Sequence, residues 1–243
     1  MATGRLILIE GMIGAGKSTT AAKLADWLTS HGEDVCVYNE FADDHPIRTK
    51  VTDLLRVANP DTTTVPPDVG EDGVARDPQV YGLDQWTRLV SRCTAGQQTV
   101  ILEGTFLQNS VLPAFMDEAP IDEVKAVFAR IESQVASANP LLIYLRPSDI
   151  DDALRRVHRA RGEAWASQNM AYVSNIPWAR RRGLTGRQAI IELYRVWESV
   201  VDELLATSSC DTLLVLDPQD DWEAALEHIH SAVRAFPRIS YPA

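Results

Sequence analysis

One glycine-rich segment, Gly11-Met12-Ile13-Gly14-Ala15-Gly16-Lys17-Ser18, narrows the possible folds more than any other part of the sequence. It follows an apolar run, precedes an amphipathic stretch and matches the Walker A pattern G-x-x-x-x-G-K-[ST]. Its glycines let the backbone wrap closely around phosphates with the N–H groups pointing inward, and the helix that follows adds a positive dipole end. The pattern predicts an ATP site built from Gly11, Ile13, Gly14, Ala15, Gly16, Lys17, Ser18 and Thr19.

Within this loop two side chains have specific expected roles. Lys17 should reach the β- and γ-phosphates, where its charge acts in catalysis, and the Ser18 hydroxyl should ligate Mg²⁺. The alternative is a glycine-rich turn without a ligand, which the strand before it and the helix after it disfavour.

Short apolar runs separated by helical patterns predict the rest of the fold. Runs of this length and composition are typical of buried parallel strands. Five occur, namely Leu6–Glu10, Val35–Asn39, Thr99–Glu103, Leu141–Arg146 and Leu213–Asp217. Strands that alternate with helices imply right-handed βαβ units. We therefore predict an α/β fold of the P-loop NTPase type, with a doubly wound, five-stranded parallel sheet.

Three helices stand out between and after these runs. Residues 18–30 and 189–205 carry apolar side chains at three- and four-residue steps, which is the spacing of an amphipathic helix. Residues 222–236 follow Asp220, and Glu223 comes three residues after it, which resembles a capping box.

Two stretches interrupt the alternation. Residues 59–78 are rich in Pro, Gly, Asp and Thr without periodicity, which predicts a long loop on the substrate side. Residues 162–186 predict a mobile or partly helical insertion. No repeat or linker divides the chain, so we expect a single domain over residues 1–243, with the substrate-side loop 59–78 and a lid or insertion over 155–186.

Composition excludes several classes of protein. The net charge of −11, from 34 acidic and 23 basic residues, argues against bulk nucleic-acid binding but permits a small anionic or cationic ligand. No apolar run is long enough to span a bilayer, and the N-terminal apolar run reads as a buried strand and not a signal peptide. Cys36, Cys93 and Cys210 form no CxxC pair, so a cytoplasmic protein without a metal or disulfide framework is expected.

A carboxylate follows each of two predicted strands. Glu40 comes after the second run and Glu103 ends the third. Ligands of doubly wound sheets sit at the carboxyl ends of the strands, so both side chains should face the nucleotide. Glu103 is then expected to orient Mg²⁺, and Glu40 to accept a proton from an attacking hydroxyl. The alternative for either one is a solvated loop residue.

The motifs together resemble the deoxynucleoside kinase and thymidylate kinase group of P-loop kinases. Glu40 stands where that family places its catalytic base, and Glu103 matches the Glu of its Glu-Arg-Ser motif. The segment Gln85–Arg92 is similar to the family's pocket helix, in which a Gln reads the nucleobase and a Ser-Arg pair follows. The resemblance implies a nucleoside-kinase-like fold in which Gln85 and Arg92 bind the acceptor.

The resemblance extends to a lid and a last strand. Tyr144–Pro147 followed by Arg155–Gly162 looks like the family's strand-then-lid segment, and Leu214–Asp217 looks like the strand whose following loop borders the adenine. It implies catalytic roles for Arg155 and Arg159 and a nucleotide contact for Arg161. The alternative is a solvated helix face paired with Asp151 and Asp152.

Departures from the family indicate a rebuilt acceptor site. Gly104 stands in place of the Arg of Glu-Arg-Ser, and Thr105–Asn109 does not follow the familiar sequence. Asp43, Asp44 and His45 after Glu40 are candidates for contact with the acceptor. Tyr81 and Trp86 are candidates for stacking on it, with core packing as the alternative.

These observations favour an ATP- and Mg²⁺-dependent kinase that acts on a small molecule, with a nucleoside or nucleotide as the preferred acceptor. An antibiotic O-phosphotransferase of the same architecture is the alternative, because the acidic residues suit a cationic acceptor such as an aminoglycoside. A nucleotide-regulated switch or assembly ATPase is the alternative from another class. The sequence lacks a clear Asp-x-x-Gly switch. No bulk nucleic acid or membrane partner is expected, and a homodimer is permitted.

Overall fold

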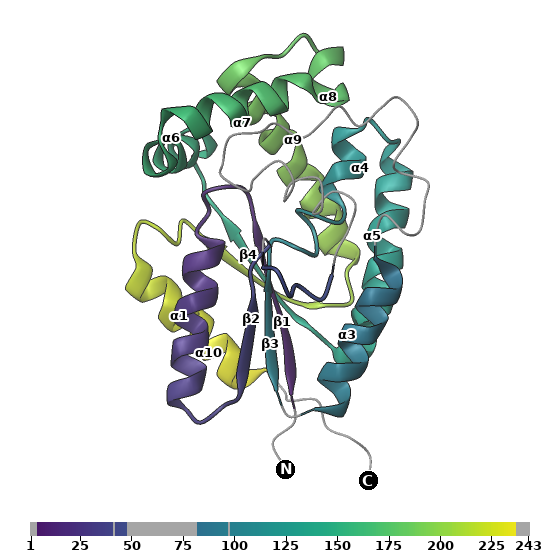
Figure 1. Cartoon of the computed structure of the whole chain (residues 1–243), viewed down its shortest axis with the longest axis vertical. Helices are drawn as coiled ribbons and strands as arrows, with labels where there is room; N and C mark the ends of the chain where they lie inside the picture. The colour runs from purple at the N-terminus through teal and green to yellow at the C-terminus, as the bar shows by residue number, and fades with distance from the viewer. Residues whose placement is uncertain (1–3, 41, 48–81, 97, 237–243) are drawn as a thin grey trace.

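The computed structural model describes residues 4–40, 42–47, 82–96 and 98–236 (Figure 1). Within them one sheet holds five strands: β1 (Arg5–Gly11), β2 (Val35–Tyr38), β3 (Thr99–Glu103), β4 (Leu141–Arg146) and β5 (Asp211–Leu216). The expected loop at 59–78 and the candidate residue Tyr81 lie outside the described residues.

All strand pairings in this sheet are parallel, and the strand order is β2-β3-β1-β4-β5. The register places Ile9 of β1 opposite Glu103 of β3, and Gly11 opposite Leu145 of β4. The phosphate loop and the end of β3 therefore meet at one edge of the sheet. The predicted doubly wound, five-stranded parallel sheet is confirmed.

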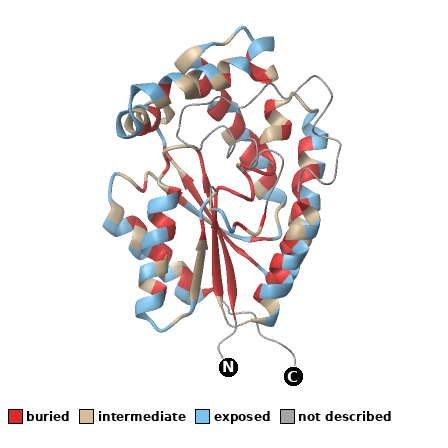
Figure 2. Ribbon diagram, in the orientation of Figure 1, coloured by how far each residue is buried: buried red, intermediate tan, exposed pale blue. Residues whose placement is uncertain are grey.

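Strands that are buried along their whole length were easy to identify from the sequence. Every residue of β1 and β3 is buried, whereas the edge strands β2 and β5 are partly exposed (Figure 2). A strand covered on both faces must be apolar throughout, and this is why the central runs read as continuous hydrophobic segments.

Helices cover both faces of the sheet (Figure 1). One face carries α1 (Lys17–Ser30) and α10 (Trp222–Ala235), and the other carries α3 (Leu83–Ala95), α5 (Ile121–Val135) and α9 (Gly186–Thr207). Right-handed crossovers produce this division for the observed strand order. Each helix turns an apolar stripe inward, as α9 does with Ile190, Trp197 and Val201.

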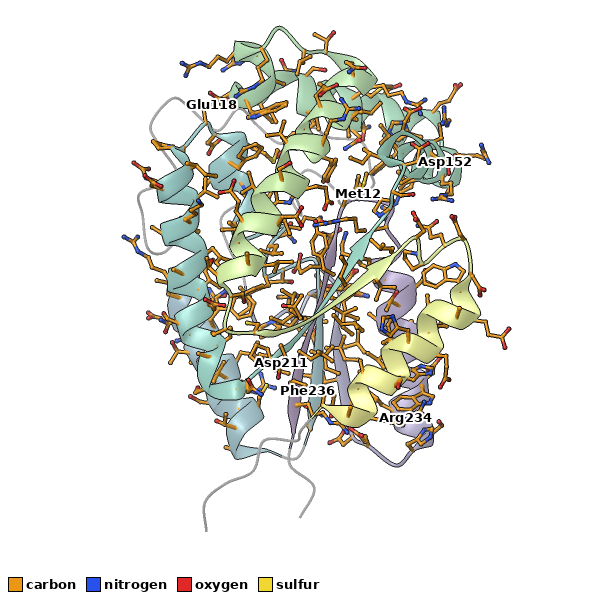
Figure 3. All side chains as sticks on the ribbon, turned by 180° about the vertical axis from the view of Figure 1, so that it is seen from behind. Met12, Glu118, Asp152, Asp211, Arg234 and Phe236 are labelled. Atoms are coloured by element: carbon orange, nitrogen blue, oxygen red, sulfur yellow. The ribbon has the colours of Figure 1, made fainter. Side chains whose placement is uncertain are left out.

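A helical layer stands over the carboxyl edge of the sheet (Figure 1). It consists of α4 (Leu112–Met116), α6 (Ile150–Arg161), α7 (Glu163–Asn175) and α8 (Pro177–Arg181), while the 3₁₀ turn η3 (Ala136–Ala138) leads into β4. The predicted insertion at 162–186 is thus mainly helical. Seen from behind in Figure 3, Met12 of the phosphate loop lies below the layer that carries Asp152.

Two details of the sequence-based prediction were wrong. The side chain that caps α10 is Asp221, which accepts a hydrogen bond from the Ala224 backbone N–H, and Asp220 does not serve as the cap. β5 begins at Asp211 and not at Leu213, because backbone pairing with β4 extends beyond the apolar run. Backbone hydrogen bonds define a strand, and they do not require apolar side chains on an exposed edge.

Two further findings concern the chain as a whole. All three cysteines are free thiols. Within the described ranges, we find no helix that combines the length and apolar character needed to cross a membrane.

Candidate active site

The loop between β1 and α1 presents unpaired backbone donors. Gly16 precedes α1 in a left-handed conformation with φ of 100°, and no side chain caps the helix. A Cβ at Gly16 would lie 2.6 Å from Cη2 of Trp222, so both the backbone angle and the packing require glycine. The first N–H groups of α1 are therefore left for an anion, and they lie at the positive end of the helix dipole. This geometry fits the phosphates of a nucleotide.

The Lys17 side chain folds back onto the backbone of the phosphate loop. Its side chain is buried, and Nζ donates hydrogen bonds to the carbonyl oxygens of Gly11 and Met12, both at 3.1 Å. The ammonium group is thus held over the loop by neutral acceptors, which a phosphate oxygen can replace with a stronger, charge-assisted contact.

Ser18 and Glu103 meet beside the loop. Ser18 Oγ lies 3.1 Å from Oε1 and 2.9 Å from Oε2 of Glu103, and it donates to the carboxylate. Glu103 is 2% exposed and ends β3, so the sheet fixes its position. A hydroxyl and a carboxylate supply the oxygen ligands that Mg²⁺ prefers, with further positions left for water and phosphate. The two residues therefore fit a magnesium site.

Glu40 lies just beyond the end of β2 and faces the same edge. Its Oε2 accepts hydrogen bonds from Gln108 Nε2 at 2.8 Å and from Asn109 Nδ2 at 3.4 Å. Burial raises the pKa of Glu40 above its ordinary value, whereas nearby Lys17 acts to lower it. A carboxylate with a raised pKa is better matched to accepting a proton near neutral pH.

Gly104 brings Glu40 and Lys17 together. Its φ is +63°, and a Cβ there would lie 3.1 Å from Glu40 Oε2 and 3.2 Å from Lys17 Cε. Any side chain at this position would therefore be strained and would press between these two groups. The arginine that the resembled family has at this point would need a strained φ and a shift of Glu40 and Lys17, and here the amides of Gln108 and Asn109 contact Glu40.

Glu10 is a buried carboxyl group that the sequence did not single out. It precedes the phosphate loop, is 1% exposed and accepts hydrogen bonds from the backbone N–H groups of Phe106 at 2.6 Å and Gln108 at 3.1 Å. Burial raises the pKa of Glu10 to about 7, although these hydrogen bonds and Lys17 act to lower it. Glu10 thus fixes the backbone of the segment that contacts Glu40.

The raised pKa of Glu10 predicts a pH dependence of stability. The carboxyl group ionises near pH 4.5 in the unfolded chain and near pH 7 in the folded one, so its contribution is complete below pH 4.5 and is lost as the pH rises to 7. A shift of this size corresponds to about 3 kcal/mol. In urea unfolding across this range, wild type should lose about 3 kcal/mol of stability relative to Glu10→Gln as the pH rises from 4.5 through 7, because the glutamine does not titrate. Parallel curves for the two proteins would contradict the assignment.

The three predicted lid arginines have different partners in the structure. Arg155 pairs with Asp151 at 2.8 Å and with Asp152 at 3.7 Å on the surface of α6, which is the solvated alternative considered from the sequence. Arg159 is exposed. Arg161 lies over the ring of Trp165, 5.2 Å from its centroid, and its charge acts to lower the pKa of Glu40. Arg161 is exposed like Arg155 and Arg159, and it is the member of this trio whose charge acts on Glu40.

Residues expected to bind the acceptor differ in how far they are buried. Asp43 and Asp44 are exposed on the turn after Glu40, and Gln85 stands at the start of α3. His45 is buried, and its ring nitrogens lie 2.7 Å from the Ile47 carbonyl oxygen and 3.1 Å from the Thr105 hydroxyl.

Two other candidates lie on α3. Trp86 is fully buried and packs edge-on against Phe106, so core packing, the alternative considered for it, is what the structure shows. Arg92 belongs to the last turn of α3 and interacts with Tyr38.

Three further residues near the loop were not identified as site residues. The side-chain amide of Gln219 donates to the Gly14 carbonyl oxygen, and Trp222 packs against Gly16. The Ile13 backbone N–H donates a hydrogen bond to the Tyr194 hydroxyl oxygen, and burial raises the pKa of that hydroxyl. Gln219 follows the strand whose next loop borders the adenine in the resembled family, so the sequence indicated its region and not the residue, whereas Tyr194 lies on α9 and had no such signal.

Comparisons with known proteins give one local match. No family model matches the chain. A segment of 52 residues is 44% identical to a thymidylate kinase from Chromobacterium violaceum. The segment amounts to 21% of this chain and 24% of that protein, so the match spans about a quarter of the relative's length. At the level of this segment, the predicted resemblance to the thymidylate kinase group is confirmed.

Several solved structures align over most of the chain with low scores. YorR from Bacillus subtilis, in complex with phosphorylated GDP, is 16% identical with a TM-score of 0.47 and covers 94% of this chain and 95% of its own. A shikimate kinase from Acinetobacter baumannii, in complex with shikimate, is 13% identical with a TM-score of 0.45 and coverage of 96% and 95%. A thymidylate kinase from Candida albicans is 15% identical with a TM-score of 0.41 and coverage of 82% and 93%. At these scores the alignments carry no argument about function.

Proposed function

We propose that this protein is a P-loop phosphotransferase that moves the γ-phosphoryl group of ATP, with Mg²⁺, to a hydroxyl group of a small molecule. The observation that supports this most strongly is the convergence of Lys17, the Ser18–Glu103 pair and Glu40 at one edge of the sheet. A nucleotide-binding loop alone needs no proton acceptor on its open side. The Glu40 carboxylate beside Lys17 gives the site one.

Each residue has a defined part in this proposal. When bound, Mg²⁺-ATP would supply the phosphoryl group and part of the countercharge. The free N–H groups at the start of α1 and Lys17 would hold the phosphates, and Ser18 with Glu103 would hold the metal. Glu40 would take the proton of the attacking hydroxyl while the new O–P bond forms and the bond to the β–γ bridging oxygen breaks. Arg161 would add positive charge from the lid.

A nucleoside or nucleotide is the acceptor we favour. The thymidylate kinase segment supports it, and Gln85 at the start of α3 would be the residue that reads the nucleobase. The exposed Asp43 and Asp44 keep a cationic antibiotic as the alternative. The alternative from another class, a nucleotide-regulated ATPase switch, predicts turnover that does not depend on an acceptor.

Acceptor-dependent release of ADP tests this proposal. ADP release should be slow with Mg²⁺-ATP alone, rise with the correct member of a panel of nucleosides, nucleotides and aminoglycosides, and stop in EDTA. Ser18→Ala should raise the Mg²⁺ concentration needed for half-maximal rate, because the metal loses a ligand. Ser30→Ala, at the exposed end of α1, is the matched control. ADP release that ignores every acceptor would favour the switch, and full activity in EDTA would refute the metal site.

A further inference from the structure

The side-chain amide of Gln108 has a fixed orientation beside Glu40. Its nitrogen lies 2.8 Å from Glu40 Oε2. An ionised carboxylate accepts hydrogen bonds and donates none, so the amide nitrogen must face Glu40 and the amide oxygen must face away from it. Because Oε1 and Nε2 are bonded to the same carbon, the amide oxygen stays close to Glu40 while it points away from the carboxylate.

This amide oxygen lacks a donor. Gln108 Oε1 is shielded from solvent and accepts no hydrogen bond from any described residue. A shielded acceptor without a partner destabilises the protein, because it has lost its hydrogen bonds to water and gained none in return. Buried polar atoms are nearly always satisfied, so an exception beside a candidate catalytic carboxylate points to a partner that arrives with the ligand.

The position of Gln108 is set by its backbone and not by chance packing of a surface side chain. Its N–H donates to Glu10 Oε2 at 3.1 Å, and the neighbouring Phe106 N–H donates to Glu10 Oε1 at 2.6 Å. Glu10 itself belongs to β1, which is buried along its whole length. The free oxygen of Gln108 is therefore held by the same rigid strand that begins the phosphate loop.

The two acceptors together define the chemistry of the substrate. Glu40 needs the proton of the attacked hydroxyl, and Gln108 Oε1 needs a second donor beside it. We propose that Gln108 is a specificity-determining residue that accepts a hydrogen bond from a second hydroxyl or amino group of the acceptor, close to the phosphorylated hydroxyl. On the proposed function, on which this rests, the acceptor is a diol or an amino alcohol.

Matched acceptors that differ in one donor test this inference. Ribonucleosides and deoxyribonucleosides are assayed beside their 3′-deoxy analogues, and aminoglycosides with a 3′-hydroxyl beside those without it. Wild type should prefer the complete acceptor by roughly tenfold to a hundredfold in kcat/KM, the range that one unmade buried hydrogen bond gives. Gln108→Met keeps the length of the side chain without its polar atoms, and it should reduce that preference to about twofold or less.

The measured quantity is the ratio of kcat/KM between the complete and the incomplete acceptor, and not the absolute rate. Gln108→Met also removes a donor to Glu40, so it should slow both members of a pair. Gln188→Met, an exposed position on α9, is the control and should keep the wild-type preference. If Gln108→Met does not fold, Gln108→Ala removes the amide without adding apolar bulk and gives the same test.

Each outcome has a separate meaning. Wild-type activity without preference for the complete acceptor, or a preference that survives loss of the Gln108 amide, overturns the inference and leaves the phosphotransferase intact. Absence of acceptor-dependent ADP release across the whole panel overturns the proposed function, and the inference falls with it. Loss of preference in the Gln108 variant alone supports both.

Discussion

Lys17→Ala should lose phosphoryl transfer by roughly a hundredfold or more while it remains folded. The ammonium group is the cation enclosed by the phosphate loop, and removal of one preorganised charged donor from a transition state costs about 3–4 kcal/mol. The measurement is the steady-state rate of ADP release at saturating ATP and acceptor, with circular dichroism to confirm the fold.

The fold should survive because, among the described residues, the hydrogen bonds of Lys17 Nζ are local. They join it to the carbonyl oxygens of Gly11 and Met12 within the same loop. Lys23→Ala, on the exposed face of the same helix, is the matched control and should keep the wild-type rate. A folded Lys17→Ala protein with more than about a tenth of the wild-type rate would remove Lys17 from the proposed mechanism.

The sheet could be predicted from the sequence because its central strands are buried on both faces. Continuous apolar runs mark β1, β3 and β4 within one residue at either end. The edge strand β5 was harder, since its first residues, Asp211 and Thr212, pair with β4 through backbone groups and carry polar side chains. Periodicity and composition report side-chain burial, and they are silent where only the backbone is paired.

The same distinction applies to the candidate site, in which some residues could be predicted from local sequence patterns and others could not. Lys17, Ser18, Glu103 and Glu40 could be placed because a loop motif and strand ends fix where their side chains emerge. The contacts of Gln108 with Glu40, and of Glu10 with the segment after β3, join residues 68 and more than 90 positions apart, and no local pattern encodes them. The signal that could have identified Glu10 is its charge inside an otherwise apolar run, since a buried carboxylate needs donors.

The lid shows the limit of reasoning from charge alone. Arg155 and Arg161 stand on one predicted helix, and both suit a phosphate. Asp151 and Asp152 pair with Arg155 at 2.8 and 3.7 Å, whereas Arg161 lies over the ring of Trp165. An arginine three or four residues after an aspartate is therefore expected to form its ion pair within the same helix.

Glu40→Gln should separate a kinase from a protein that only binds ATP. The amide keeps the shape of the side chain and removes the proton acceptor. Turnover with the true acceptor should fall by roughly a hundredfold or more, which is the usual size of a general-base contribution. ATP affinity should change little, because the hydrogen-bond partners of Glu40 are Gln108 and Asn109 and not the loop N–H groups. Calorimetry and the steady-state rate are measured on the same preparation, with Glu227→Gln on the exposed face of α10 as control.

The pH dependence of the rate gives an independent test of the same residue. A base must be ionised to act, so the wild-type rate should rise with pH through the pKa of Glu40, which burial places above the ordinary glutamate value of 4.5. This acidic limb should vanish in Glu40→Gln. If rate and affinity both stay at wild-type values, Glu40 is not the base. If ATP binding collapses instead, the carboxylate serves the metal–nucleotide complex, and the proton acceptor must be sought among Asp43, Asp44 and Glu103.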